Sequence, residues 1–226
     1  MGNKVSPRAI RLKVSQPFDV TWYADNKQFS SILREDLKLR SFIEKKLESA
    51  GLLRLVINRL RDSIEFKIFC IKPAFVVGKR GAGIEDLSKE IRNLTGKEVK
   101  FSISDVRKLE SCAAYVAKEF GNELKKKRVS PRRVMKKLVQ NAKRSGALGI
   151  RVECSGRLAC AEIARTEWYQ EGAVPRQTFK ADVDYCAQGV NTPWGTCGVK
   201  VWIYKGDVIG DDIAKNLGFV KKVENA

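Results

Sequence analysis

Histidine does not occur among the 226 residues of this chain, which removes the side chain that most often acts as a general acid or base near neutral pH. No paired carboxylates, nucleophile-elbow motif or Walker loop supplies comparable chemistry elsewhere in the sequence. We therefore expect a protein that is not an enzyme and that has no small-molecule substrate.

Cysteine occurs without the spacing of a metal site. The six cysteines, at positions 70, 112, 154, 160, 186 and 197, include no C-x-x-C pair. A zinc site would have to gather four of these thiolates without the usual paired spacing. Cys70 and Cys154 alternate with aliphatic residues and resemble small core side chains. We expect no metal, no cofactor, and unpaired thiols in a reducing compartment such as the cytosol.

Long apolar runs are also missing. No stretch approaches the roughly 18 apolar residues of a membrane span. The first residues, MGNKVSPRAIRLKV, lack the apolar segment of a secretory signal peptide. We expect neither a membrane span nor a secretory leader, and a cytoplasmic location.

Acidic residues are too few to balance the basic ones. Lys and Arg number 44 against 26 Asp and Glu, so the net charge is +18. Such an excess repels itself in a compact fold and usually indicates a polyanionic partner, with nucleic acid the first candidate and an anionic membrane the second. Apolar residues make up 43% of the chain, enough for the core of one large or two ordinary domains.

A Gly-x-x-Gly motif, Gly78-Lys79-Arg80-Gly81, is the most informative local feature. Its glycines can take positive φ and let a ligand approach the backbone, while the helix expected from Ile84 points its N–H groups at the same place. KH domains hold a single-stranded nucleic acid at such a loop. The plain alternative is a two-glycine turn with surface cations.

The first half of the chain has the element order of a type II KH domain, here assigned to residues 17–108. Apolar spacing predicts helices over 29–50 and 84–95 and strands over 53–57, 64–70 and 99–103, with a short element from Pro73. Before them, residues 1–16 form a basic arm that contains Lys4, Arg8 and Arg11 and no acidic residue. The arm has no periodic apolar face, so we expect it to be poorly ordered until it binds RNA.

The second half predicts another α+β domain, over residues 129–207, with a mostly antiparallel sheet. An amphipathic helix over 109–124 lies in a connecting segment, 109–128, and residues 208–226 form a tail. Ser130-Pro131 begins a helix whose polar face includes Arg132, Arg133 and Lys136 with no acidic residue. A face of one sign favours phosphate contact over a merely solvated surface. Alternation predicts strands in 148–154, 179–185 and 199–203.

Three longer stretches carry a family resemblance. They are SGRLACAEIARTEWYQEGAVPRQTFKADVDY at 155–185, GVKVWIYKGD at 198–207 and VQNAKRSGALGIRVE at 139–153. With the KH motif, they make the chain similar to the family of small-subunit ribosomal protein three, the KH-containing protein of the small-subunit head, in its bacterial or organellar form.

The resemblance implies a structural role on the ribosome. It implies rRNA binding by Lys4, Arg8 and Arg11 of the arm and RNA binding by the KH loop, with the kind of RNA at the loop left open. It places Arg132, Arg133 and Lys136 at the mRNA entry channel, where phosphate contacts help to unwind mRNA. It further implies ribosomal proteins ten and fourteen as neighbours, with proteins four and five near the channel.

Alternatives remain open from the residues themselves. Trp168 and Tyr169 fill a core or protein interface, or else stack on RNA. The runner-up function is a free-standing KH-domain RNA chaperone or regulator. A nucleic-acid lyase that uses a lysine Schiff base is a third, although no buried lysine stands out.

Overall fold

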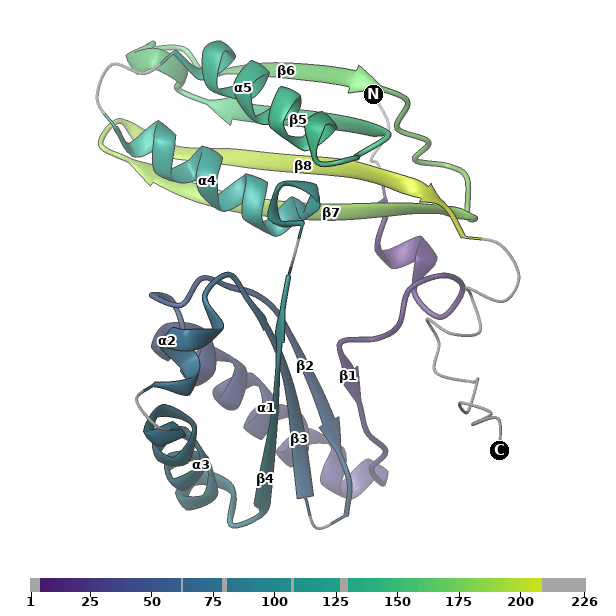
Figure 1. Cartoon of the computed structure of the whole chain (residues 1–226), viewed down its shortest axis with the longest axis vertical. Helices are drawn as coiled ribbons and strands as arrows, with labels where there is room; N and C mark the ends of the chain where they lie inside the picture. The colour runs from purple at the N-terminus through teal and green to yellow at the C-terminus, as the bar shows by residue number, and fades with distance from the viewer. Residues whose placement is uncertain (1–4, 62, 79–80, 107, 127–129, 209–226) are drawn as a thin grey trace. The chain divides into compact units, whose positions relative to one another are not determined.

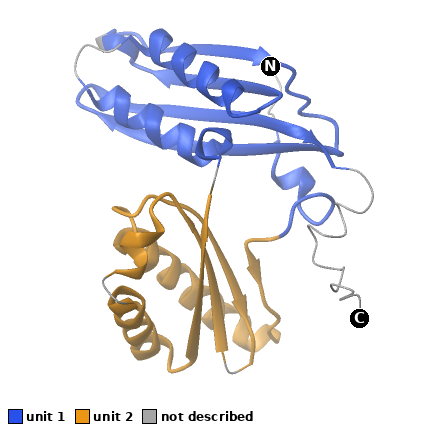
Figure 2. Cartoon of the chain, viewed as in Figure 1, with its two compact units in different colours: residues 1–17, 108–226 blue, residues 18–107 orange. Residues whose placement is uncertain are grey.

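A computed structural model describes residues 5–61, 63–78, 81–106, 108–126 and 130–208. The chain forms two compact units, residues 18–107 and residues 1–17 with 108–226 (Figure 2). We call them the N-terminal unit and the C-terminal unit. In the described part of the chain, no helix is long and apolar enough to cross a membrane. The tail expected over 208–226 lies outside the described residues from 209 onward.

The N-terminal unit is a four-stranded sheet with three helices (Figure 1). Its elements are β1 (Val20–Thr21), α1 (Asn26–Lys46), β2 (Leu52–Arg59), β3 (Ser63–Cys70), α2 (Pro73–Val77), α3 (Ala82–Thr95) and β4 (Glu98–Asp105). The strand order is β1-β2-β3-β4, with β2 and β3 antiparallel and the two outer pairs parallel. All three helices and the sheet contribute to one apolar core.

The alternating pattern of β3 is confirmed. Ile64, Phe66, Ile68 and Cys70 are all 0% exposed. Phe66 also stacks on Phe101 of β4, with ring centroids 5.4 Å apart. The sequence pattern missed β1, because a two-residue strand is too short to show periodicity.

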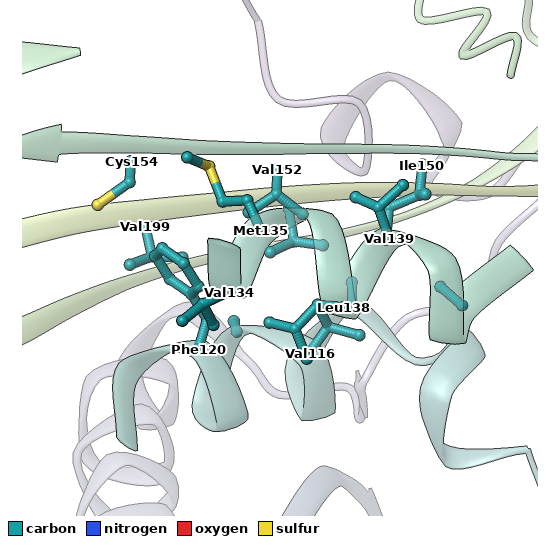
Figure 3. Packing of buried hydrophobic residues seen from close by; sticks show 14 of the residues in the cluster. Val116, Phe120, Val134, Met135, Leu138, Val139, Ile150, Val152, Cys154 and Val199 are labelled. Atoms are coloured by element: carbon teal, nitrogen blue, oxygen red, sulfur yellow. The ribbon is translucent and has the colours of Figure 1, made fainter. Parts of the chain in front are cut away.

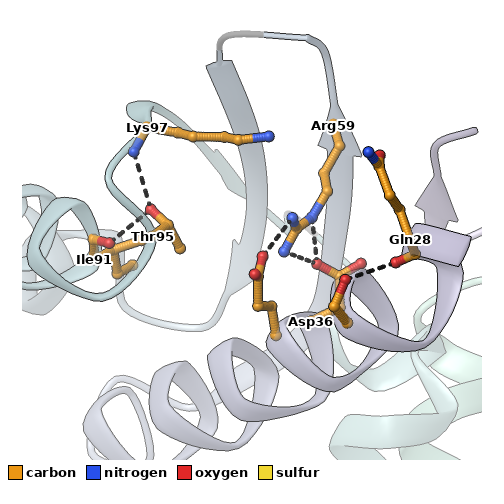
Figure 4. Close-up of polar contacts among 8 residues, drawn as sticks. Gln28, Asp36, Arg59, Ile91, Thr95 and Lys97 are labelled. Atoms are coloured by element: carbon orange, nitrogen blue, oxygen red, sulfur yellow. Dashed lines mark hydrogen bonds and ion pairs between the residues drawn. The ribbon is translucent and has the colours of Figure 1, made fainter. Parts of the chain in front are cut away.

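The apolar spacing that predicts α1 does not match its buried face throughout. Leu33 and Leu37 are 41% and 58% exposed, whereas Asp36 is buried. The cause is Arg59 of β2, whose guanidinium lies 2.5 Å from the Asp36 carboxylate and 3.0 Å from that of Glu35 (Figure 4). A buried carboxylate needs such a partner, so Asp36, and not Leu33 or Leu37, lies on the buried side at the start of the helix. The helix also spans Asn26–Lys46 rather than 29–50.

The C-terminal unit packs two long helices on one face of an antiparallel sheet (Figure 1). Its helices are α4 (Ala113–Lys125) and α5 (Pro131–Arg144), and its strands are β5 (Gly149–Gly156), β6 (Arg165–Gly172), β7 (Ala181–Thr192) and β8 (Gly195–Asp207). Short 3-10 turns lie at Ala9–Arg11, Leu109–Ser111 and Leu158–Cys160. The strand order is β6-β5-β8-β7, and every pair is antiparallel.

Helix α4 belongs to the C-terminal core instead of serving as a separate connection between domains. Val116 and Phe120 of α4 pack beside Val134 and Leu138 of α5, over the strand residue Val152 (Figure 3). The sequence showed that this helix has an apolar face, but it did not show which sheet covers that face. Thus the compact C-terminal unit begins near residue 108 and includes the segment expected to connect the domains.

Five cysteines are free thiols, namely Cys70, Cys112, Cys154, Cys186 and Cys197. Cys70, Cys154 and Cys197 are buried, and burial raises the pKa of Cys154 to about 12, with smaller contributions from Cys197 and Glu167. No three metal-ligating side chains gather within the described ranges. The Cys154 thiol therefore stays protonated near neutral pH and packs as a small apolar group.

Candidate nucleic-acid interface

The KH loop lies between α2 and α3, after the buried strand β3. Gly78 has φ 70° and Gly81 has φ 86°, the left-handed region that favours glycine. A Cβ at Gly78 would lie 2.9 Å from the Gly83 nitrogen, whereas one at Gly81 would meet nothing within 4 Å. Gly78 is therefore required by both space and φ, and Gly81 by φ alone. Lys79 and Arg80 lie outside the described residues.

Gly83 is a third glycine that sequence reasoning missed. A Cβ at this position would lie 2.7 Å from the Val76 carbonyl oxygen, so only glycine lets α2 and α3 approach so closely. This approach points the free N–H groups of the first turn of α3 toward the loop. The available signal was the spacing of the motif, since Gly83 follows Gly81 by two residues.

The exposed face of α5 is basic, as expected. Val134, Leu138 and Ala142 enter the core at intervals of four, which leaves the cationic side chains at the surface. The exposed cations are Arg132, Arg133, Lys136, Lys137, Lys143 and Arg144. Ser130 occupies the N-cap position and Pro131 the first turn, although the serine side chain makes no capping hydrogen bond.

Strand β6 supplies carboxylates to one edge of this face. Arg132 lies 3.3 Å from Glu167, which also pairs with Arg165 at 2.8 Å. Lys143 pairs with Glu171 at 2.9 Å. Arg133 forms no ion pair with any described residue and keeps its charge available. The run of basic residues along α5 could not predict these acidic partners, because they come from β6, a strand that the alternation of the sequence did not identify.

The two aromatic residues of β6 have opposite surroundings. Tyr169 packs against the helix-side core, and Lys136 Nζ lies 5.9 Å from its ring centroid. Trp168 is 57% exposed and lies beside Arg151 of β5. Successive side chains of a strand point to opposite faces, so no single alternative describes both residues.

The basic arm is docked on the C-terminal unit, and this corrects the expectation for Arg11. The Arg11 guanidinium is fully buried. Its Nε donates to the Ala181 carbonyl at 2.6 Å, and Nη1 donates to that of Pro7 at 2.8 Å. Its Nη2 donates to the carbonyls of Thr178, Pro175 and Arg176 at 2.7, 3.1 and 3.3 Å. With its donors occupied, Arg11 cannot also bind phosphate.

Burial lowers the pKa of Arg11, and the nearby Asp182 carboxylate partly offsets this effect. Gln16 adds a hydrogen bond of 3.0 Å from its amide nitrogen to the Asp182 carboxylate. Residues 5–17 therefore have a packing partner within the chain, which the lack of a periodic apolar face did not predict. Arg8 is half-buried, and Lys4 lies outside the described residues.

Comparison with known proteins agrees with the two-unit structure. Residues 38–111 match the family model described as a KH domain, and residues 122–203 match that of "Ribosomal protein S3, C-terminal domain". "Small ribosomal subunit protein uS3" of Ruegeria pomeroyi is 46% identical over 94% of this chain and 90% of its own length. The Idiomarina loihiensis uS3 is 47% identical over 93% and 92%, and that of Pelotomaculum thermopropionicum is 44% identical over 92% and 90%.

The chain belongs to the uS3 family of small ribosomal subunit proteins. This confirms the predicted family, in its bacterial or organellar form, and with it the α+β fold of a KH domain followed by an S3 C-terminal domain. The uS3 relatives are named as ribosomal proteins and not as enzymes. The family model for the C-terminal domain covers α5 and β6, so the basic helix and its carboxylate partners lie within the matched segment.

Proposed function

We propose that this protein acts in the head of the small ribosomal subunit, binding rRNA and lining the mRNA entry channel with α5. The chain is a uS3 ribosomal protein of the small subunit with an RNA-binding KH domain. The proposal assigns Arg132, Arg133 and Lys136 to mRNA phosphates and places ribosomal proteins four and five near them. Proteins ten and fourteen are the proposed neighbours within the head.

The observation that supports this proposal most is the exposed basic face of α5 on a well-packed helix. Its cations project from a helix whose other side is buried, so they are held at regular spacing. Arg133 and Lys136 lie about one turn apart and share a face. Guanidinium and ammonium groups contact successive phosphates without reading bases, as a passing message requires. Ribosomes with alanine at Arg132, Arg133 and Lys136 test the proposal, because an entry role predicts a defect confined to structured messages.

Glu167 should limit how strongly α5 attracts RNA. Its buried carboxylate pairs with Arg132 and Arg165, so Glu167→Gln removes a negative charge from the basic face with little change in shape. We expect tighter binding of single-stranded RNA at low salt and a log–log salt slope steeper by up to about 0.7, the value for one added phosphate contact. Filter binding across a salt series measures this slope.

The matched control is Glu171→Gln, which frees Lys143 at the far end of the same helix. If both variants steepen the slope equally, general electrostatics explains the effect. If Glu167→Gln weakens binding, the carboxylate must instead hold Arg132 in a productive position.

We also propose that the KH loop contacts RNA, and Gly81→Asp tests this. Nothing lies within 4 Å of the added Cβ, so the cost to the fold is the strain of one side chain at φ 86°, while a carboxylate would stand where a phosphate must approach. We expect binding of short single-stranded RNA to weaken by ~1–3 kcal/mol.

Gly96→Asp is the matched control, because Gly96 ends the same helix with φ 65° and equally open space. It adds the same side chain and similar backbone strain away from the loop. Circular dichroism confirms folding of both variants. Equal RNA affinities of the folded Gly81→Asp variant and the unmodified protein would make the loop structural.

A further inference from the structure

The outer face of the C-terminal sheet, opposite α4 and α5, carries a row of aromatic and cationic side chains. Ile150 and Val152 of β5 enter the core beneath the helices, so alternation places Arg151 between them on the outer face. Arg151 lies opposite Trp202 of β8, and Trp202 lies opposite Tyr185 of β7. We call Trp168, Arg151, Trp202 and Tyr185 the outer row.

Members of the outer row are in contact across all four strands. The Arg151 guanidinium carbon lies 4.3 Å from the Trp168 ring centroid and 5.8 Å from that of Trp202. The Trp202 and Tyr185 centroids are 5.3 Å apart, and Arg176 lies 5.2 Å from the Trp202 ring. The outer row thus holds aromatic rings and cations in fixed positions. Trp168, on the edge strand β6, is itself 57% exposed.

A hollow of about 940 Å³ adjoins the outer row. Pro7 and Ile10 of the docked arm line it, as do the 174–178 segment, Tyr185 and Trp202. Arg176 and Lys200 add two positive charges to its lining. Glu153 supplies a carboxylate, but this carboxylate is engaged by Arg151 at 3.1 Å. The lining therefore combines apolar walls with available cations.

Two buried donors of the outer row lack acceptors. The Trp202 indole Nε1 and the Arg151 Nε have no hydrogen-bond partner within the described part of the chain. Trp202 is only 6% exposed, so its unpaired N–H is costly. Both unsatisfied groups are donors and the nearby available charges are positive. The complementary ligand is one rich in acceptors, anionic, and able to stack.

We propose that the outer row and its hollow bind an unpaired RNA nucleotide, whose base stacks on the row while its phosphate lies near Arg176 and Lys200. This inference rests on the RNA-binding role proposed above and adds a second surface on the other side of the sheet from α5. A stacked base uses the π faces, and its carbonyls and ring nitrogens are acceptors. A nucleotide also places a phosphate charge next to a stacking ring, which matches the cations Arg176 and Lys200 beside the outer row.

The test compares RNA binding by the full chain with that of one double variant and two single-variant controls. Trp168→Ala with Arg176→Gln removes an exposed stacking surface and one cation, and should lower the affinity for a short oligoadenylate about tenfold or more. Trp168→Phe keeps a stacking surface and should retain most of the affinity. Arg144→Gln, which removes an exposed cation that has no proposed RNA contact, supplies a control for general loss of charge. Unchanged affinity in the folded double variant overturns the proposal.

Photocrosslinking distinguishes the possible sources of the nucleotide. An oligonucleotide carrying 4-thiouridine should crosslink to β6 or β8 peptides of the full chain. In assembled small subunits, 4-thiouridine placed in rRNA or in mRNA shows which strand supplies the nucleotide. Crosslinks from Lys200 to another protein, with none to RNA, would overturn the proposal in favour of a protein interface. This test is independent of the entry-channel proposal, because Trp168→Ala should not alter translation through a hairpin.

Discussion

Ribosomes in which Arg132, Arg133 and Lys136 are all alanine should slow markedly on a message with a stable hairpin and little on an unstructured one. The three side chains lie on the exposed face of α5, and the buried face that holds the helix is untouched. Alanine is also the best helix former, so the fold and incorporation into the subunit should survive. Losing three phosphate contacts should flatten the salt dependence of mRNA binding by about 2 in log–log slope.

The measurement is the ratio of elongation rates through the two messages, in variant and unmodified ribosomes. The matched control replaces Lys137, Lys143 and Arg144, three exposed cations of the same helix. It removes the same charge from residues without a proposed role at the channel. An unchanged ratio in the first variant would leave its three residues as rRNA anchors or solvent-facing charge. Equal defects in both variants would show that only total charge matters.

Arg11→Met should release the arm and destabilise the C-terminal unit by about 3 kcal/mol or more, because several buried carbonyls lose their donor at a cost of about 1–3 kcal/mol each. Methionine keeps much of the apolar volume but donates no hydrogen bonds. The carbonyls of Ala181, Thr178 and Pro7 would then lie beside an apolar side chain. Buried acceptors without donors account for most of the expected loss.

Urea denaturation measures the stability, and limited proteolysis within residues 5–17 measures release of the arm. Lys13→Met is the control, because Lys13 is exposed and loses the same charge. Arg11→Lys should rescue little, since one ammonium group cannot reach acceptors that a planar guanidinium spans. Should Arg11→Met weaken rRNA binding while stability and protease resistance stay unchanged, the original assignment of Arg11 to RNA would be restored.

The sequence by itself determined the elements whose signals are local. Alternation identified β3, spacing of four identified α5, and a one-signed run identified its basic face. Each signal needs only neighbours within one or two turns, or along one strand. The Gly-x-x-Gly motif likewise marked a loop whose glycines have the positive φ that the motif requires.

Only the tertiary structure decided the features that depend on distant partners. Arg11 is buried because carbonyls more than 160 residues away surround it, so a residue that looked like a free cation became part of a core. Asp36 is buried because the guanidinium of Arg59, on another element, pairs with its carboxylate. Trp168 and Tyr169 have opposite surroundings because both lie on β6, a strand that the sequence pattern missed. Local periodicity shows that a side chain can be buried, but the partner that satisfies its polar groups comes from elsewhere in the fold.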